Sequence, residues 1–377
     1  MAKIIFYIKY FLFLFILFFE YSCNNPVNSN NSFSTLRGGI GDGAVWGLTV
    51  YNNQLIAGGN FTIAGGASAN HLALWNGSSW SQIGSGVSGG ESNSGVIALT
   101  VYNGNLIAGG FFTMAGSDSA NNIAQWNGDS WSALGKGVFV VAHSSWINTL
   151  VIYNGNLIAG GFFTMAGSDS ANNIAQWNGN SWSPLNSGLS GGASVVLALI
   201  VYNGNLVAGG SFTQAGSINV NNIAQWNGSL WSSLASGVLG SSSEIQALTV
   251  YSGNLIAGGS FTQAGGNSAN NIAQWNGSTW LPLGSGVSGG SPSTWINILM
   301  VYENNLIAGG NFSQAGGNNI NYLAKWNGSS WLPLISSLSF NTNTGIYALT
   351  IYNGNLIVGG YFSTSGVISA NNIFQWH

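Results

Sequence analysis

Three tryptophans, Trp46, Trp146 and Trp295, are the residues best suited to hold a ligand. Each lies among Gly, Ser, Asn and Thr, with few charged side chains nearby. A flat indole face beside neutral hydroxyl and amide groups suits a sugar ring, through apolar stacking and uncharged hydrogen bonds. Tyr347 and His143 join these tryptophans in one candidate ligand site.

Carboxylates that could support acid–base catalysis are scarce, because Asp and Glu number only 8. Glu91, Glu244 and Asp42, with His143, are the candidates for such chemistry. A hydrolase or lyase needs its acid and base held close together, and no motif pairs these residues. We therefore assign no catalytic residue and treat Glu91 and Glu244 as candidate ligand-binding residues.

Metal, cofactor and nucleic-acid binding are not predicted. The only histidines are His71, His143 and His377, and Cys23 is the only cysteine, whereas zinc sites need clustered His or Cys. No Asp-x-Asp cluster offers several oxygens to calcium. Lys and Arg number 5, too few for the basic surface that binds phosphates.

The elements that position these residues are copies of one unit of about 50 residues, which marks a repeat architecture. Within one copy we predict short strands at residues 97–102, 105–113, 122–126 and 130–138. Asn-Gly lies between the first and second strands and again between the third and fourth, as in tight hairpins. The unit is marked by a tyrosine at Tyr51, Tyr102, Tyr153, Tyr202, Tyr251, Tyr302 and Tyr352, and by a tryptophan at Trp75, Trp126, Trp177, Trp226, Trp275, Trp326 and Trp376.

The two ends of the repeat region complement each other. The last copy stops after its third strand at Trp376, whereas residues 33–40 match the fourth strand of the other copies. Pairing the two would close a ring and leave no open edge. The sequence thus predicts an all-β fold, a seven-bladed β-propeller of four-stranded antiparallel blades, with the N-terminal strand completing the last blade.

Residues 33–377 resemble kelch and galactose-oxidase-type propellers, through a strand ending in Gly-Gly and a tryptophan beside the third strand. They are more similar to a bacterial repeat of the form GGxFTxAG…NNIAxWNGSSW. A galactose oxidase would imply copper held by two His and a Tyr crosslinked to Cys. With Cys23 the sole cysteine, that activity is excluded.

The repeat places the irregular aromatics near the central axis, on the face that carries the long loops. Trp146 and Trp295 lie seven residues before their unit's tyrosine, and Trp46 and Tyr347 lie five before. Because side chains alternate along a strand with a period of two, residues at both offsets are expected to point to the same side of the strand. These aromatics could bind a ligand or fill the wide end of the central channel; the repeated tryptophans are predicted to be core.

The first residues are typical of an export signal. Lys3 and Lys9 are followed by an apolar run at residues 10–19, as in signal peptides. Ser22-Cys23 resembles a lipoprotein signal, which implies lipidation at Cys23; an ordinary cleaved signal or an uncleaved anchor is the alternative. We predict a signal at 1–22, a polar tether at 23–32 and the propeller at 33–377.

These observations favour an exported binding module, lipid-anchored at the cell envelope or secreted, that binds a neutral glycan or protein through its loop-bearing face. A carbohydrate-active enzyme using the loop acids, and a passive surface scaffold, remain alternatives. We expect a monomer that touches the membrane only through a lipid anchor.

Overall fold

The computed structural model describes residues 33–90, 94–141, 143–291, 293–335, 339–340, 345–365 and 370–377. Every regular element in this part of the chain is a β-strand, which confirms the predicted all-β class. No helix among the described residues is long and apolar enough to cross a membrane. The predicted signal, Cys23 and the tether lie outside the described residues.

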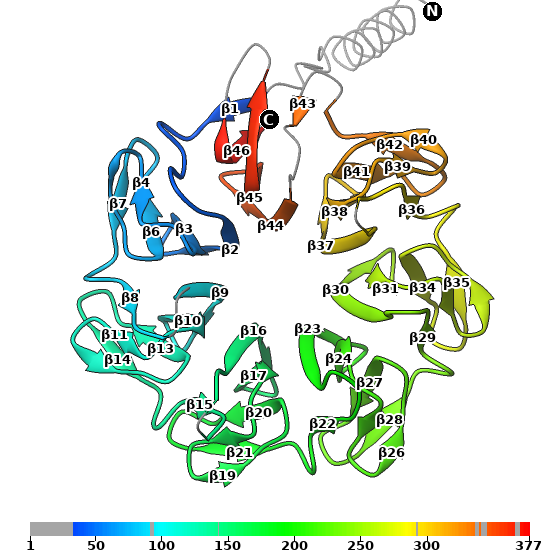
Figure 1. Cartoon of the computed structure of the whole chain (residues 1–377), viewed down its shortest axis with the longest axis horizontal. Coiled ribbons are helices and arrows are strands. Elements are labelled where there is room, and N and C mark those ends of the chain that lie inside the picture. The colour runs from blue at the N-terminus through cyan, green and yellow to red at the C-terminus, as the bar shows by residue number, and fades with distance from the viewer. Residues whose placement is uncertain are drawn as a thin grey trace, which may run out of the picture. The chain divides into compact units, whose positions relative to one another are not determined.

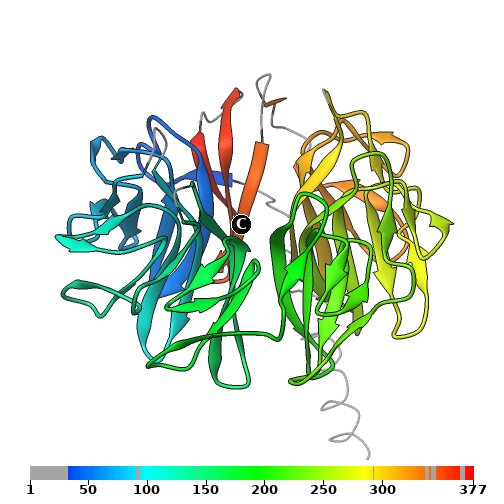
Figure 2. The ribbon, with the colours of Figure 1, turned by 60° about the horizontal axis from the view of Figure 1, so that its bottom comes forward.

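Phe33–Trp376 forms one compact unit of antiparallel sheets (Figure 1). A representative sheet has the order β9 (Gly95–Tyr102), β10 (Asn105–Phe111), β13 (Ile123–Trp126) and β14 (Trp131–Ala133). Each sheet presents its first strand to a common axis and its last to the rim. The tilted view in Figure 2 shows strands running from one face of the unit towards the other.

The other sheets repeat this order. Their first strands are β2 (Val45–Tyr51), β16 (Trp146–Tyr153), β23 (Val195–Tyr202), β30 (Glu244–Tyr251), β37 (Trp295–Tyr302) and β44 (Gly345–Tyr352). Their second strands are β3 (Gln54–Gly59), β17 (Asn156–Phe162), β24 (Asn205–Ser211), β31 (Asn254–Ser260), β38 (Asn305–Asn311) and β45 (Asn355–Ser365).

In each sheet the third strand pairs with the second strand on the side towards the rim. They are β6 (Leu72–Trp75), β20 (Ile174–Trp177), β27 (Ile223–Trp226), β34 (Ile272–Trp275), β41 (Leu323–Trp326) and β46 (Asn371–Trp376). The fourth strands are β7 (Trp80–Gln82), β21 (Trp182–Pro184), β28 (Trp231–Ser233), β35 (Trp280–Pro282), β42 (Trp331–Pro333) and, beside β46, the strand β1 (Phe33–Thr35).

Positive backbone φ angles explain the tight turns between first and second strands. Asn103 and Gly104 have φ of 49° and 80°, the conformation in which Asn-Gly is favoured. Where a copy lacks the glycine, Asn53 and Asn304 adopt φ of 60° in its place. Asparagine tolerates this region better than other residues with a Cβ.

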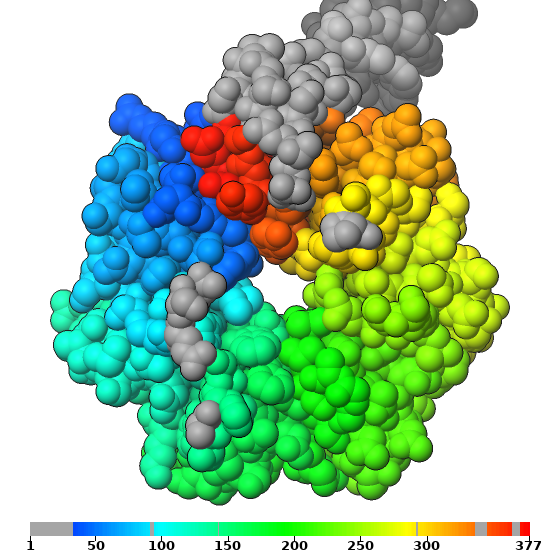
Figure 3. Space-filling model, in the orientation of Figure 1, coloured from blue at the N-terminus to red at the C-terminus, as the bar shows by residue number. Residues whose placement is uncertain are grey.

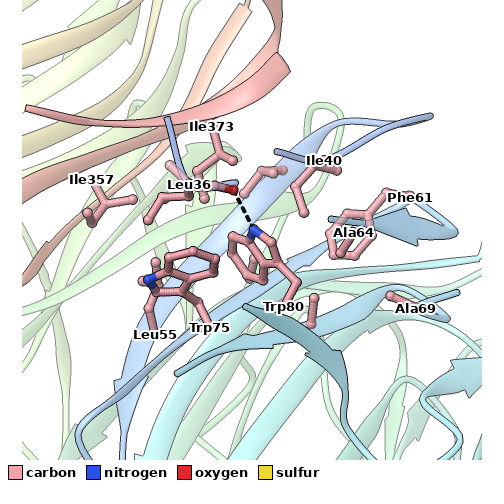
Figure 4. Close-up of a cluster of buried hydrophobic side chains, with 14 of the residues drawn as sticks. Leu36, Ile40, Leu55, Phe61, Ala64, Ala69, Trp75, Trp80, Ile357 and Ile373 are labelled. Carbon is pink, nitrogen blue, oxygen red and sulfur yellow. Dashed lines mark hydrogen bonds between the residues drawn. The ribbon is translucent and has the colours of Figure 1, made fainter. Parts of the chain in front are cut away.

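β1 pairs with β46 across nearly the whole length of the sequence. Phe33 lies opposite Trp376, and Thr35 lies opposite Phe374. In the next sheet, the Trp80 indole N–H donates to the carbonyl of Leu36, 2.8 Å away (Figure 4). The N-terminal segment 33–36 therefore bonds to two neighbouring sheets.

The same indole bond joins other neighbouring sheets. Trp131 Nε1 donates to the Ile83 carbonyl at 3.0 Å, and Trp182, Trp231, Trp280 and Trp331 do likewise to the carbonyls of Leu134, Leu185, Leu234 and Leu283. Phe33 holds the corresponding place in β1 and has no side-chain N–H to offer. Each such bond contributes about 1 kcal/mol.

The core lies between neighbouring sheets rather than in one central mass. In the cluster of Figure 4, Leu36, Trp75 and Trp80 pack with Ile357 and Ile373 of the next sheet, all of them buried. Cross-strand indole pairs such as Trp75–Trp80 lie 5.4 Å apart. The repeated tryptophans are therefore core, as predicted.

A second set of small sheets, not predicted from the sequence, bridges successive units. After β14 the chain forms β15 (Val138–Phe139), which pairs with the hairpin of β18 (Met165–Ala166) and β19 (Asp169–Ser170) in the following copy. The single predicted strand at 130–138 is thus two strands in different sheets. The same arrangement recurs for β8 (Val87–Ser88), β11 (Met114–Ala115) and β12 (Asp118–Ser119); β22 (Leu189–Ser190), β25 (Gln214–Ala215) and β26 (Ile218–Asn219); β29 (Val238–Leu239), β32 (Gln263–Ala264) and β33 (Asn267–Ser268); and β36 (Val287–Ser288), β39 (Gln314–Ala315) and β40 (Asn318–Asn319). At the two ends of the repeat region, β4 (Ile63–Ala64) pairs with β5 (Ala67–Ser68), and β43 (Ser339–Phe340) pairs with β45.

In most units an asparagine in the left-handed conformation fixes the loop before the third strand, and Tyr322 holds this position in one unit. Asn122, with φ of 63°, accepts a bond from the Phe112 N–H and donates one to the Val138 carbonyl at 2.9 Å. In the first unit His71 stands there with φ of 67°. Its buried Nδ1 has no hydrogen-bond partner.

Candidate functional site

Each first strand carries one residue that has no partner in the second strand. In β16, Ile147 pairs with Gly161 and Thr149 pairs with Gly160, so Asn148 is left over as a β-bulge. The same skip occurs in every first strand, and we call these residues the bulge ring: Trp46, Ile97, Asn148, Leu197, Gln246, Asn297 and Tyr347.

The paired glycines of the second strand make the bulge sterically feasible. A Cβ on Gly110 would overlap the backbone oxygen of Gly95 in the bulged strand, and a Cβ on Gly109 would lie 2.8 Å from the Ile147 side chain of the next unit. Only glycine fits where a backbone approaches this closely. The Gly-Gly motif of the second strand therefore determines the position of the bulge in the first strand.

The bulge ring lines a central cavity of about 520 Å³. Figure 3 shows an opening at the centre of the molecule. Below the ring the wall is mostly aliphatic, with Leu48, Leu99, Leu150, Leu199, Leu248 and Leu349 two residues further along their strands. None of the described lining residues is acidic, basic or a histidine. The cavity therefore offers apolar surface and uncharged polar groups.

Two carboxamides of the ring bond to the following strand. Asn148 Nδ2 donates to the Val196 carbonyl at 3.1 Å, and Asn297 Nδ2 donates to the Ile346 carbonyl at 3.0 Å. A carbonyl oxygen can only accept, so these bonds determine the orientation of each amide, with its nitrogen towards the first strand of the next sheet. The bonds also satisfy edge-strand carbonyls that would otherwise need water.

Gln246 is the third carboxamide of the ring. Its Nε2 donates to Glu244 two residues earlier, and its buried Oε1 has no hydrogen-bond partner. A buried unsatisfied oxygen costs about 1–3 kcal/mol.

The two aromatic members of the ring lie over glycines at the start of the strands. The Trp46 ring covers Gly95 of the next sheet, where a Cβ would approach the indole to 2.6 Å, and the Tyr347 phenol folds over Gly345. Burial raises the pKa of the Tyr347 hydroxyl. This phenol therefore stays neutral at physiological pH and can both donate and accept.

The structure brings only part of the predicted site together. Trp46 and Tyr347 line the cavity, whereas Trp146 and Trp295 are not among its lining residues. They begin β16 and β37, and Trp146 stacks on Phe162 of its own sheet at 4.9 Å and 30°. The two offsets do not line one cavity together, because the residue five before the tyrosine is itself the unpaired bulge residue, which interrupts the alternation of the strand.

Of the remaining predicted residues, Glu244, His143 and Asp42 are not among those that line the cavity. Glu244 begins β30 and accepts the Gln246 bond, while His143 is exposed and forms an isolated bridge with Val140. Glu91 lies outside the described residues. Asp42 accepts bonds from the Thr62 and Ile63 amides at 2.7 and 3.0 Å.

Hydrogen bonds keep the pKa of Asp42 below its ordinary value. Partial desolvation raises the pKa of Asp42, but the bonds from Thr62 and Ile63 outweigh it and leave the pKa below its ordinary value. Across the described ranges, no group of three or more His, Cys, Asp or Glu side chains could hold a metal ion.

Sequence reasoning missed Asn148, Gln246 and Asn297. A signal for them existed in the repeats themselves. Five residues before the marker tyrosine the residue type differs in almost every copy, whereas the residue three before it is always leucine. Variation at one position of an otherwise uniform strand marks a place that packing does not fix.

Comparisons with known proteins agree on the fold. A family model described as a domain of unknown function (DUF5122) beta-propeller matches residues 252–276. The extracellular domain assigned to the one-component system BT4673 of B. thetaiotaomicron is similar, with a TM-score of 0.57 and 11% identity, over 90% of this chain and 40% of that one. This chain thus spans less than half of that neighbour.

The computationally designed Ika8 protein is another similar structure, with a TM-score of 0.49 and 14% identity over 90% of this chain and 97% of that one. No protein of curated function matches the sequence. With the sheet order above, the family match and the first neighbour identify a β-propeller, and function must be argued from the cavity and its rim.

Proposed function

We propose that this chain is an exported β-propeller that binds a neutral ligand, a glycan or a protein, through its loop-bearing face and the cavity below it. The observation that carries this proposal is a cavity of about 520 Å³ walled by aromatic, aliphatic and carboxamide side chains. Concave, mostly apolar sites with a few polar groups are typical ligand sites.

The architecture we propose is a ring of seven blades, related to kelch-type propellers and closed by β1. It is supported by the β1–β46 pairing, by the Trp80–Leu36 bond, and by the contacts of β2 with both β44 and β9. In a closed ring the bulge ring surrounds the axis completely. The face that carries the longer loops is then a continuous rim around the cavity mouth.

Export and attachment through a lipid on Cys23 complete the proposal. The apolar run at residues 10–19 before Ser22-Cys23 supports it, and the first structural neighbour is an extracellular domain. Radioactive palmitate should label the wild-type protein in its native host. The Cys23→Ser variant should not be labelled, and equal labelling would disprove lipidation at this residue.

An enzyme of the carbohydrate-active class receives less support. The carboxylates of Asp42 and Glu244 bond to Thr62 and Gln246, and none of the described residues that line the cavity is an acid.

A glycan array together with a protein pull-down tests the binding function. The wild type should give a signal that changes little between low and high salt, because few charges take part. Trp146→Ala with Trp295→Ala should weaken the signal, since both residues begin strands at the loop-bearing end. Leu230→Ala is the control, because Leu230 is 63% exposed in the turn between β27 and β28. A wild type that binds nothing in either assay would refute the function.

A further inference from the structure

The chain presents the dipeptide Asn-Gly in two kinds of tight turn. Inner turns join the first and second strands, near the common axis, and outer turns join the third and fourth strands, towards the rim (Figure 1). The inner-turn asparagines are Asn103, Asn154, Asn203 and Asn353, and the outer-turn asparagines are Asn76, Asn127, Asn178, Asn227, Asn276 and Asn327. All of them are exposed, so the two sets offer the same dipeptide to solvent in different surroundings.

In the outer turns the backbone holds the side-chain amide of the asparagine. Asn127 Oδ1 accepts hydrogen bonds from the amide N–H groups of Asp129 and Ser130, at 2.9 Å each. The Asn127 N–H in turn donates to the Ser130 carbonyl at 3.3 Å. Both side-chain bonds recur in the other outer turns at 2.9–3.0 Å. An outer-turn side chain must break these bonds before it can rotate.

In the inner turns the side-chain amide has no such bonds. Within the described part of the chain, no hydrogen bond involves the side-chain amide of Asn103, Asn154, Asn203 or Asn353. The strand pairing next to the turn joins the flanking residues, Tyr102 and Asn105. A Cβ built on Gly104 would meet no atom within 4 Å. The asparagine side chain can therefore approach the glycine nitrogen without breaking a side-chain bond or disturbing the strands.

We propose that the four inner-turn asparagines are sites of spontaneous deamidation, and that the outer-turn hydrogen bonds protect the other six. The main-chain nitrogen of the following glycine loses its proton to solvent base and attacks the side-chain carbonyl carbon, Cγ. The new N–C bond closes a succinimide ring while the amide nitrogen takes up a proton and leaves as ammonia. Water then opens the ring to aspartate or isoaspartate. Glycine has no Cβ to hinder this approach, and access to the attacking geometry controls such an intramolecular step.

Each deamidation adds one carboxylate at the end of a first strand. The formal net charge of the chain is −3, so modification of all four inner turns more than doubles it. The first strands also line the central cavity, and none of its described lining residues is charged. The modification therefore introduces negative charge near the axis. It does not depend on the proposed binding function.

Incubation of the full chain at mildly alkaline pH, folded and in guanidinium chloride, tests this inference. Peptide mass spectrometry after digestion at acid pH measures the deamidated fraction at each Asn-Gly over time. In the folded protein the inner turns should react about fivefold faster or more, because closure in an outer turn must first break a hydrogen bond. In guanidinium chloride the two sets should react at similar rates, since the turns are lost and glycine follows every asparagine.

The other inner turns provide matched controls. Asn52-Asn53 has φ of 48° and 60° but no glycine, so Asn52 should stay unmodified while Asn103 reacts. Ser252 holds the position of Asn103 in another unit, with φ of 49°. Asn103→Ser should therefore fold normally, remove one acidic species on ion-exchange chromatography and leave the rate at Asn154 unchanged.

Three results would overturn the inference. The first is equal rates for the inner and outer turns of the folded protein, and the second is faster reaction in the outer turns. The third is inner turns that remain unmodified while the denatured chain reacts, because the folded inner turn would then be protective itself. None of these results bears on ligand binding, so the proposed function would stand.

Discussion

At the scale of the residue, a hydrogen bond from the indole N–H of the fourth-strand tryptophan joins neighbouring sheets. Trp131→Phe keeps the aromatic ring and removes the 3.0 Å bond to the Ile83 carbonyl. We expect a loss of about 1–2 kcal/mol in the free energy of unfolding, because a buried carbonyl loses its donor. Urea unfolding measures this. Trp126→Phe, in the same indole pair but without a described indole hydrogen bond, should cost less; an equal cost would mean that packing alone matters.

His71 is a second residue-scale case, since it replaces the bridging asparagine of most other units. Burial lowers the pKa of His71, and the nearby Asp42 charge offsets this only in part. A lowered pKa in the folded protein means that its stability contribution is complete above about pH 6.5 and is lost as the pH falls through the folded value.

His71→Asn should remove that loss and raise the free energy of unfolding by about 1 kcal/mol through the restored bridge. Its Oδ1 would accept from the Phe61 amide and its Nδ2 would donate to the Val87 carbonyl, as Asn122 does in the next unit. Unfolding curves at pH 5 and pH 8 check this. A pH dependence identical to that of the wild type would assign the acid sensitivity to another group.

At the scale of the element, the bulged first strand depends on the glycine pair opposite it. Gly110→Ala should destabilise the fold by about 3 kcal/mol, since its Cβ would overlap the Gly95 carbonyl and the rigid strand cannot yield. Gly104→Asn in the adjoining turn should be nearly neutral, because Asn53 and Asn304 already adopt its conformation. Thermal unfolding of both variants compares them, and a stable Gly110→Ala would show that the bulge can move.

The sequence predicts much of this element and misses its register. Asn103-Gly104 correctly located the hairpin, and period-two reasoning located the strand. The extra residue in the strand was not foreseeable from alternation, because Gly-Gly permits a bulge without saying which strand takes the additional residue. Trp46 therefore reached the cavity as predicted, while Trp146 stacks on Phe162. The small bridging sheets were missed because two-residue strands have no periodicity to detect.

At the scale of the whole molecule, stability should depend on β1. A variant lacking residues 1–40 loses the burial of Phe33, Leu36 and Ile40, at about 2 kcal/mol each. It also exposes the edge of β46, which favours self-association. Thermal unfolding and light scattering should therefore show a lower midpoint and oligomers. The variant lacking residues 1–32 keeps β1 and should remain a stable monomer; equal behaviour of the two would contradict a closing role for β1.

The pairing of β1 with β46 has a consequence for biosynthesis. A nascent chain produces Phe33–Thr35 long before their partner strand, Asn371–Trp376. During this time β1 lacks the hydrogen bonds of its partner strand. Its pairing with β46 closes a longer loop than any other described strand pairing, and the entropic cost of closure rises with loop length. The sheet of β46 is therefore completed by a segment that was synthesised long before the rest of that sheet.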